Sequence, residues 1–177
     1  PAEQTPLVAA EAVRLLHDAG ISRDVLQLLP GSGPVIGDAL LPDARLAGVA
    51  FTGSTATARH IQRALAQRDG PMVPLIAETG GINAMIVDST ALPEQVTRDV
   101  MTSAFQSAGQ RCSALRLLCV QEEVADRQLE MIAGAMGVLR VGDPAWLATD
   151  VGPIIDEEAL AGLQAYCEEA ERRFRVV

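Results

Sequence analysis

The chain has 177 residues, 49% of them apolar and 21% charged, with 14 basic against 23 acidic residues and a net charge of −9. This length suits one domain or parts of two, and no apolar run approaches the roughly 18 residues that a membrane span needs. The acidic balance has the wrong sign for binding phosphate backbones, so we expect a globular chain with no transmembrane segment and no nucleic-acid partner.

The first half of the chain alternates helical and extended patterns. Thr5, followed by Pro6, predicts a helix that runs to about residue 19 and ends at Gly20. A short apolar run, Val25 to Leu29, is typical of a strand, and the Pro- and Gly-rich segment 30–34 ends it. The further elements expected in this half are a helix over 35–41, a strand over 48–51, a helix over 55–68 and a strand over 72–77.

The second half continues the alternation with longer helices. The expected elements are an extended run over 83–87, a helix over 92–108, a strand over 115–121, a helix over 123–139, a loop over 141–155 and a helix over 156–173. Strands that alternate with helices favour a layered α/β architecture with largely parallel strands.

A small-residue turn, Gly53-Ser54-Thr55, lies directly before a predicted helix. The first N–H groups of a helix are unpaired and its dipole is positive there, so a pyrophosphate would be stabilised at this turn. The alternative is that Ser54 or Thr55 only caps the helix. The same two interpretations apply to residues 31–33, where the full G-x-G-x-x-G fingerprint is absent because Ile36 replaces its last glycine.

Three cysteines form neither a disulfide framework nor a metal-type spacing, which favours a reducing cytosol. Cys112 lies in a polar segment after a helix, where Arg111 and backbone donors would lower its thiol pKa and favour a reactive thiolate. Cys119 lies in an apolar run and is interpreted as a small core residue. Cys167, on the last helix, is expected to be incidental. By itself, a single cysteine such as Cys112 is more often structural than catalytic.

Glu78 follows an apolar strand and precedes two glycines, a place where catalytic residues of α/β sheets occur. It could equally be a helix cap or an ion-pair partner. His17 and His60 lie within helical patterns and have no ligand companion at a useful spacing, so no metal site is expected.

Four segments together are more specific than any of them alone. In their order and spacing they resemble the aldehyde dehydrogenase superfamily: 1–7, Phe51-Thr52-Gly53-Ser54-Thr55, Glu78-Thr79-Gly80-Gly81 and Gly109-Gln110-Arg111-Cys112. Segments 77–89 and 107–116 are similar to one branch, the L-glutamate γ-semialdehyde (Δ1-pyrroline-5-carboxylate) dehydrogenase domain of bacterial bifunctional proline utilization A proteins.

The resemblance implies an aldehyde dehydrogenase-like α/β fold. Residues 1–80 would form part of a Rossmann-like NAD-binding domain, and 81–177 part of the α/β catalytic domain, with a cleft between them. The implied reaction is the NAD-dependent oxidation of L-glutamate γ-semialdehyde to L-glutamate in proline catabolism. FAD would belong to a separate proline dehydrogenase domain outside this segment.

The resemblance also implies the catalytic residues. Cys112 would attack the aldehyde, and its backbone N–H would form half of an oxyanion hole, the other half coming from a residue upstream of Pro1. Glu78 would deprotonate the water that hydrolyses the thioester, provided that burial raises its pKa. Ser113 would contact the substrate carboxylate.

For the cofactor, the resemblance places Ser54 on the pyrophosphate, with Gly53 allowing close approach of the backbone. Glu3 would accept hydrogen bonds from the adenosine ribose and repel a 2′-phosphate, which favours NAD over NADP. The remaining cofactor residues that it implies are Gly33 and Pro34, beside the adenine, and Thr79 and Gly80.

Other interpretations stay open at this point. They are another NAD(P)-dependent semialdehyde dehydrogenase and a noncatalytic nucleotide-binding or assembly module. Acyl transfer to coenzyme A is disfavoured by the presence of Glu78, and a Cys–His hydrolase that pairs Cys112 with His60 is disfavoured because no orienting residue for the histidine is identified.

The chain opens without methionine, so we expect a central fragment of a longer, cytoplasmic protein that forms homo-oligomers. The partners would be the aldehyde and NAD. The isolated fragment is expected to be inactive and to associate through uncovered apolar surface.

Overall fold

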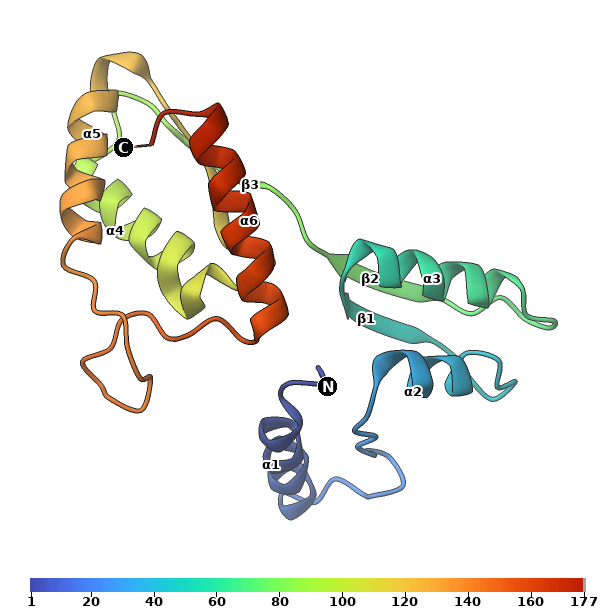
Figure 1. Cartoon of the computed structure of the whole chain (residues 1–177). Coiled ribbons are helices and arrows are strands. Elements are labelled where there is room, and N and C mark those ends of the chain that lie inside the picture. The colour runs from blue at the N-terminus through green and yellow to red at the C-terminus, as the bar shows by residue number, and fades with distance from the viewer. Residues whose placement is uncertain (177) are drawn as a thin grey trace. The chain divides into compact units, whose positions relative to one another are not determined.

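Each half of the chain builds a parallel pair of strands flanked by helices (Figure 1). The computed structural model describes residues 1–176. They divide into a first unit, Pro1–Thr79, and a second unit that begins at Gly80. The expected domain boundary lies one residue later, and Val177, the last residue of the expected second domain, lies outside the described residues.

The first unit is a β-α-β arrangement preceded by two helices. In chain order its elements are α1 (Pro6–Asp18), α2 (Gly33–Leu40), β1 (Val49–Gly53), α3 (Thr55–Ala66) and β2 (Leu75–Thr79). The two strands pair in parallel from Val49↔Leu75 to Gly53↔Thr79. Parallel strands need a long crossover connection, which α3 supplies.

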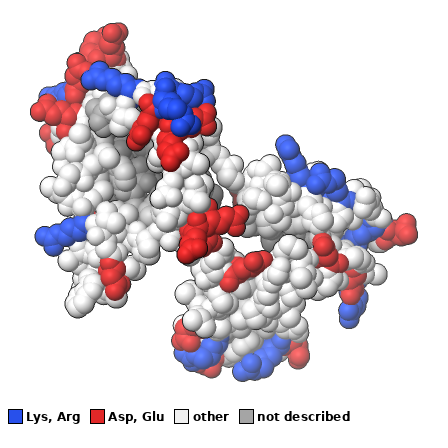
Figure 2. All heavy atoms as spheres, in the orientation of Figure 1, with Lys and Arg blue, Asp and Glu red and all other residues white. Residues whose placement is uncertain are grey.

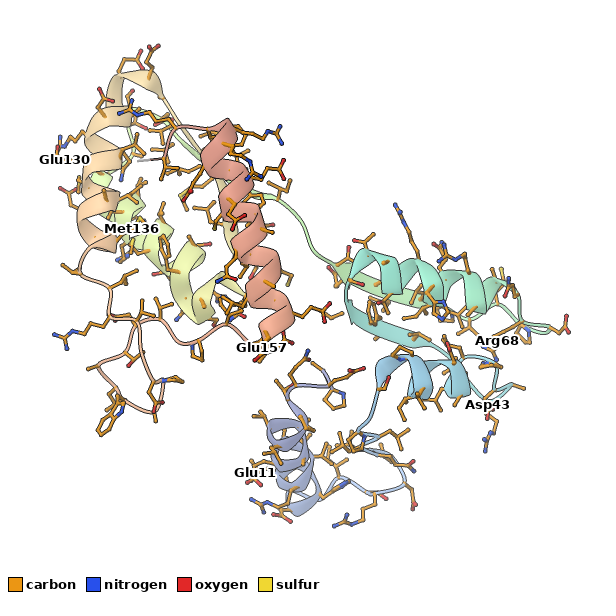
Figure 3. The ribbon with its side chains drawn as sticks, in the orientation of Figure 1. Glu11, Asp43, Arg68, Glu130, Met136 and Glu157 are labelled. Atoms are coloured by element: carbon orange, nitrogen blue, oxygen red, sulfur yellow. The ribbon has the colours of Figure 1, made fainter. Side chains whose placement is uncertain are left out.

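Apolar packing and one arginine hold this unit together. Leu41, Ala58 and Ile61 are its buried apolar residues. Arg68, just after α3, donates from Nη2 to the carbonyl oxygen of Asp43 at 2.7 Å, and both residues are labelled in Figure 3. This bond ties the end of the crossover helix to the loop that leads into β1.

The predicted strand from Val25 to Leu29 is wrong. The carbonyl oxygen of Ser22 accepts from the N–H groups of Val25 at 3.0 Å and Leu26 at 3.1 Å, so the segment begins as a turn, and Val25 is 81% exposed. A strand needs a neighbour for its backbone groups. In the described residues the sheet of this unit has only β1 and β2, and the apolar run has no strand to pair with.

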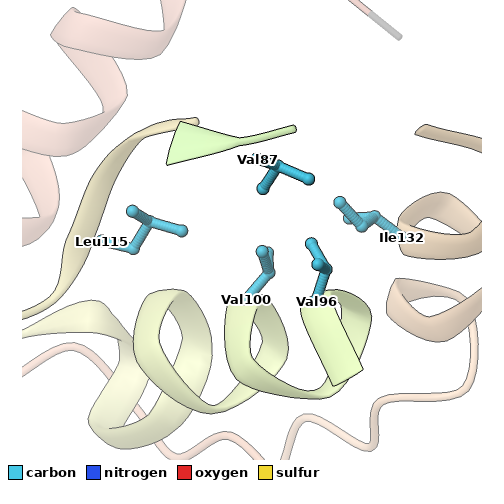
Figure 4. Packing of buried hydrophobic residues seen from close by; sticks show 5 residues of the cluster. All are labelled: Val87, Val96, Val100, Leu115 and Ile132. Carbon is cyan, nitrogen blue, oxygen red and sulfur yellow. The ribbon is translucent and has the colours of Figure 1, made fainter. Parts of the chain in front are cut away.

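The second unit places helices against one face of a second sheet. Its elements are β3 (Asn83–Val87), α4 (Pro93–Phe105), the short turn η1 (Gln106–Gly109), β4 (Leu115–Val120), α5 (Glu122–Met136) and α6 (Glu157–Arg173). Val87 of β3 and Leu115 of β4 pack against side chains of α4 and α5 (Figure 4). The other members of this buried cluster are Val96, Val100 and Ile132.

The helix predicted over 92–108 ends early, at Phe105. Ser107 and Ala108 have φ of 58° and 55°, and Gly109 has φ of 66°. Residues with a Cβ rarely adopt this left-handed conformation because it costs about 1–2 kcal/mol each. The helical pattern of residue types predicts none of it, and the turn redirects the chain toward the segment that carries Cys112.

Cys119 is exposed, so its interpretation as a core residue is wrong. Side chains alternate between the faces of a strand, and Cys119 lies opposite Ile86 on the face that points away from α4 and α5. Ile86 on that face is 84% exposed and Leu117 is 49% exposed. The residue types are those of a sheet covered on both faces, but in the described residues only one face is packed.

Charged side chains of both signs lie on the surface (Figure 2). Arg14 bonds Glu11 and Asp18 on α1, and Arg173 bonds Glu169 on α6, all in exposed positions where such pairs add little stability. Within residues 1–176, no helix has both the length and the apolar character needed to cross a membrane.

Candidate active site

The backbone that leads to Cys112 requires glycine at one position. Gly109 has φ of 66°, and a Cβ on it would lie 2.7 Å from the carbonyl oxygen of Ala104 and 3.3 Å from Nη1 of Arg116. Contacts below 3.0 Å would force the backbone to shift. The turn after α4 can therefore form with this close approach only when residue 109 has no side chain.

Arginine side chains hold the loop that follows. Arg116 donates from Nη2 to the carbonyl oxygens of Gly109 at 2.6 Å and Arg111 at 3.5 Å. The N–H of Ala114 donates to the carbonyl oxygen of Arg111 at 3.1 Å, which closes a tight turn around Cys112. Arg111 donates from Nη2 to the carbonyl oxygen of Thr102 at 3.2 Å, so its contact supports the loop.

Asn83 holds the same loop from the neighbouring strand. Its Nδ2 donates to the carbonyl oxygen of Cys112 at 2.7 Å and to that of Ala114 at 3.0 Å. Sequence reasoning missed both Asn83 and Arg116 as site residues. The available signal was an asparagine at the first position of a strand, where this residue type is disfavoured unless its side chain bonds elsewhere.

Cys112 itself is exposed in this turn, with Ser113 exposed beside it. Among the described residues, no acceptor pairs with the backbone N–H of Cys112. An accessible thiol next to a free N–H combines a nucleophile with a donor for an oxyanion.

The first unit brings several predicted residues to one edge of its sheet. Gly53 and Thr79, at the carboxyl ends of β1 and β2, are register partners, and Gly80 follows Thr79. A Cβ on Gly53 would lie 2.5 Å from Cζ of Phe51, so the backbone comes close to that ring only without a side chain. Ligands of parallel sheets bind at this edge.

The start of α3 lies at the same edge. The Oγ of Ser54 accepts from the N–H of Thr57 at 3.1 Å, which confirms the capping interpretation. In residues 1–176 the N–H groups of Thr55 and Ala56 have no acceptor. The capped turn therefore still offers unpaired donors to an anion, and the two interpretations of Ser54 are compatible.

Glu78 lies on β2, opposite Thr52 of β1. Its side chain is exposed, so the burial that its expected role as a base calls for is not provided by the described residues. Glu78 and Cys112 belong to different units of the chain.

Glu3 and Gly33 contact each other directly. The N–H of Gly33 donates to Oε1 of Glu3 at 2.6 Å, and Pro34 is the next residue of α2. Beside this contact is a hollow of about 430 Å³ lined by Pro1, Ala2, Glu3, Pro6, Pro30, Gly31 and Ser32. Glu3 and Gly33, which lie 30 positions apart, are therefore in contact, and the family resemblance assigns both to the adenosine part of the cofactor.

One expectation about His60 is wrong. Its Nε2 lies 2.9 Å from Oδ1 of Asp38, so an orienting carboxylate exists, although both side chains are exposed. In the part of the chain that the structure describes, no three His, Cys, Asp or Glu side chains are grouped as a metal ion requires.

The chain is similar to known proteins over its described length. The sequence pattern of the aldehyde dehydrogenase family matches residues 1–176. The bifunctional protein PutA of Klebsiella aerogenes is 56% identical across the full chain, which spans 14% of its length.

Solved structures agree with this result. The crystal structure of a bifunctional proline utilization A (PutA) protein has 63% identity and a TM-score of 0.93, with 99% of this chain and 18% of that one covered. The 1-pyrroline-5-carboxylate dehydrogenase from Thermus with bound NAD has 30% identity and a TM-score of 0.92, with 100% of this chain and 35% of that one covered.

Proposed function

The chain belongs to the aldehyde dehydrogenase family, and we propose that it supplies the nucleophile of an NAD-dependent oxidation of L-glutamate γ-semialdehyde to L-glutamate. The observation that carries this proposal is the exposed Cys112 beside a free backbone N–H in a firmly held turn. Likeness to PutA and to 1-pyrroline-5-carboxylate dehydrogenase supports the substrate and a role in proline catabolism. Because the chain spans only 14% of PutA, the activity is attributed to a longer protein that contains these residues.

Cys112 carries the first step. Its thiolate attacks the aldehyde carbon, a carbon–sulfur bond forms, and the carbonyl electron pair moves onto oxygen. The N–H of Cys112 has no other acceptor in the described residues and donates to that oxyanion. Because the turn is already held by side-chain bonds, this donor needs little reorganisation during the reaction.

Bound NAD would supply the acceptor for the hydride that leaves the thiohemiacetal carbon. The thioester on Cys112 is then hydrolysed. Glu78, a carboxylate with no hydrogen-bond partner in residues 1–176, takes a proton from the attacking water. The carbon–sulfur bond breaks, and the thiolate of Cys112 is regenerated. Presence of this base favours hydrolysis over transfer to coenzyme A.

The first unit has groups that fit NAD. Oε1 of Glu3 accepts from Gly33, which leaves Oε2 for ribose hydroxyls and places a negative charge where a 2′-phosphate would be repelled. The free N–H groups of Thr55 and Ala56 suit a pyrophosphate beside Ser54. The other proposed cofactor contacts are Gly33, Pro34, Gly53, Thr79 and Gly80, and the NAD bound by the Thermus relative supports this assignment.

The remaining parts of the proposal concern the surroundings of the reaction. Residues 1–80 belong to an NAD-binding domain and 81–177 to a catalytic domain, in which Ser113 contacts the substrate carboxylate. All three cysteines are free thiols, which supports a reducing compartment, the cytoplasm. The longer protein forms a homo-oligomer, and its FAD belongs to a domain outside this segment.

The test is NADH formation from Δ1-pyrroline-5-carboxylate and NAD by the longer protein. Cys112→Ala should abolish turnover, whereas Cys119→Ala, which removes another exposed thiol of the same unit, should keep it. Glu78→Gln should accumulate an acyl-enzyme that mass spectrometry detects as added mass on the Cys112 peptide. The 177-residue chain alone should give no NADH, because the family resemblance places half of the oxyanion hole upstream of Pro1.

Turnover that survives in Cys112→Ala would overturn the assignment of the nucleophile. A longer protein that binds NAD but oxidises no aldehyde would favour a nucleotide-binding module instead.

A further inference from the structure

We propose that Asn83 is a positioning residue for the Cys112 nucleophile, an inference that rests on the function proposed above. The amide nitrogen of Asn83 lies 2.7 Å from the carbonyl oxygen of Cys112 and 3.0 Å from that of Ala114. These two carbonyls flank Ser113. One side chain therefore holds two carbonyl groups of the turn that presents the thiol.

The chemistry of the amide suits this role. An asparagine NH₂ group has two N–H donors fixed in one plane, and here each donor has its own carbonyl acceptor. The carbonyl of Cys112 is bonded to the same Cα as its side chain. Holding that oxygen limits rotation of the peptide and so fixes the direction of the Cα–Cβ bond and of the N–H.

The sheet aims Asn83 at the turn. Asn83 pairs with Leu115, but the next residue, Ala84, pairs with Leu117, so Arg116 is an extra residue in β4. Such a bulge redirects side chains at the end of a strand. Arg116 then reaches the carbonyl of Gly109 at 2.6 Å. Both strands thus support the cysteine turn, β3 through Asn83 and β4 through Arg116. Of these two residues, Asn83 bonds Cys112 itself.

A purely structural role for Asn83 is the alternative, and Gln128 provides the matched control. Gln128 is 3% exposed, and its amide nitrogen donates to Oγ1 of Thr97 at 2.8 Å and to the carbonyl of Pro93 at 3.4 Å. It is the same kind of double contact in the same unit, made between α5 and α4 instead of at the turn. Its loss should lower stability without changing the geometry at Cys112.

The experiment compares Asn83→Ala, Asn83→Ser and Gln128→Ala in the longer protein. The readouts are kcat, the KM for NAD, the melting temperature and the rate of iodoacetamide labelling at Cys112 relative to Cys119. Cys119 is exposed in the same unit, so the ratio cancels any general loosening of the fold. Displacing a reacting group by about 1 Å costs about 10²-fold in rate.

We expect Asn83→Ala to lower kcat by about tenfold or more, to leave the KM for NAD within about twofold, and to lower the labelling ratio. Asn83→Ser keeps one donor, so its kcat and labelling ratio should lie between those of Asn83→Ala and the unmodified protein. If Asn83→Ala does not fold, Asn83→Ser replaces it in the comparison. Gln128→Ala should lower the melting temperature at least as much and leave kcat and the labelling ratio unchanged.

Turnover by the unmodified protein with unchanged kcat in the folded Asn83 variants would overturn the positioning role alone. Equal loss of kcat in Asn83 and Gln128 variants would also overturn it, in favour of a structural role. No turnover by the unmodified protein would instead overturn the proposed function, and the positioning role with it.

Discussion

Gly109→Ala tests whether the turn before Cys112 is held as the structure has it. Residue 109 has φ of 66°, and an alanine in this conformation costs about 1–2 kcal/mol. The new Cβ would also lie 2.7 Å from the carbonyl oxygen of Ala104. To relieve that contact the backbone must shift, which stretches the 2.6 Å bond from Arg116 to the carbonyl of Gly109. Hydrogen bonds to charged groups contribute about 1.5–3 kcal/mol, so we expect a total loss of about 3 kcal/mol.

Urea unfolding of the longer protein that contains these residues, followed by circular dichroism, measures this loss. With an m-value of about 2 kcal/mol per molar urea, a loss of about 3 kcal/mol lowers the unfolding midpoint by about 1.5 M. The matched control is Gly134→Ala on α5, where a Cβ meets nothing within 4 Å. Because alanine favours a helix over glycine by about 0.5–1 kcal/mol, this variant should raise the midpoint.

Both variants replace glycine with alanine, so midpoint shifts of opposite sign would be due to the backbone conformation and surroundings of residue 109. Gly109→Ala should also slow labelling of Cys112 relative to Cys119. A midpoint for Gly109→Ala that equals or exceeds that of the unmodified chain would refute the left-handed turn and the close approach to Ala104.

Two further predictions concern caps and acid stability. Ser54→Ala should lower the free energy of unfolding by about 1 kcal/mol and raise the KM for NAD. Asp156→Ala removes the cap of α6, so it should lower the free energy of unfolding by a similar amount and leave that KM unchanged. Equal effects of the two variants on the KM would contradict the assignment of Ser54. Hydrogen bonds from Oγ1 and the N–H of Thr90 hold the pKa of Asp88 below its ordinary 3.8. A carboxylate whose pKa is lowered by folding stabilises the protein at pH values above its pKa in the unfolded chain. That stabilisation is lost as the pH falls through its pKa in the folded chain. Asp88→Asn should therefore flatten the decline of the melting temperature below about pH 4. An equally steep decline of the melting temperature in Asp88→Asn would show that this carboxylate contributes nothing to the acid dependence of stability.

Local patterns predicted most of the helices and strands. The strand at 83–87 is confirmed, because β4 supplies the partner that its backbone groups need. The Thr5-Pro6 start of α1 is also confirmed, and it depends on neighbouring residues alone. Cys112 and Ser54 stood out for the same reason, since a polar segment around a thiol and a serine before a helix are visible along the chain. Family resemblance then joined separate segments that no single pattern could relate.

The failures depend on contacts between distant residues. Val25 to Leu29 has the composition of a strand, but a strand forms only with a partner, and composition does not say where a partner lies. Cys119 has apolar neighbours in sequence, yet the face of β4 on which it lies is not the one that α4 and α5 cover.

The sequence by itself predicted which residues would carry the chemistry, because a thiol, a carboxylate and a capping serine keep their chemical character in any fold. Tertiary structure decided how the thiol is held. Asn83 reaches the carbonyl of Cys112 across 29 positions, and Arg116 reaches Gly109 from a bulge that exists only once β3 and β4 pair. Hydrogen bonds depend on distance and direction, which the order of residues leaves open until the strands are paired and the helices packed.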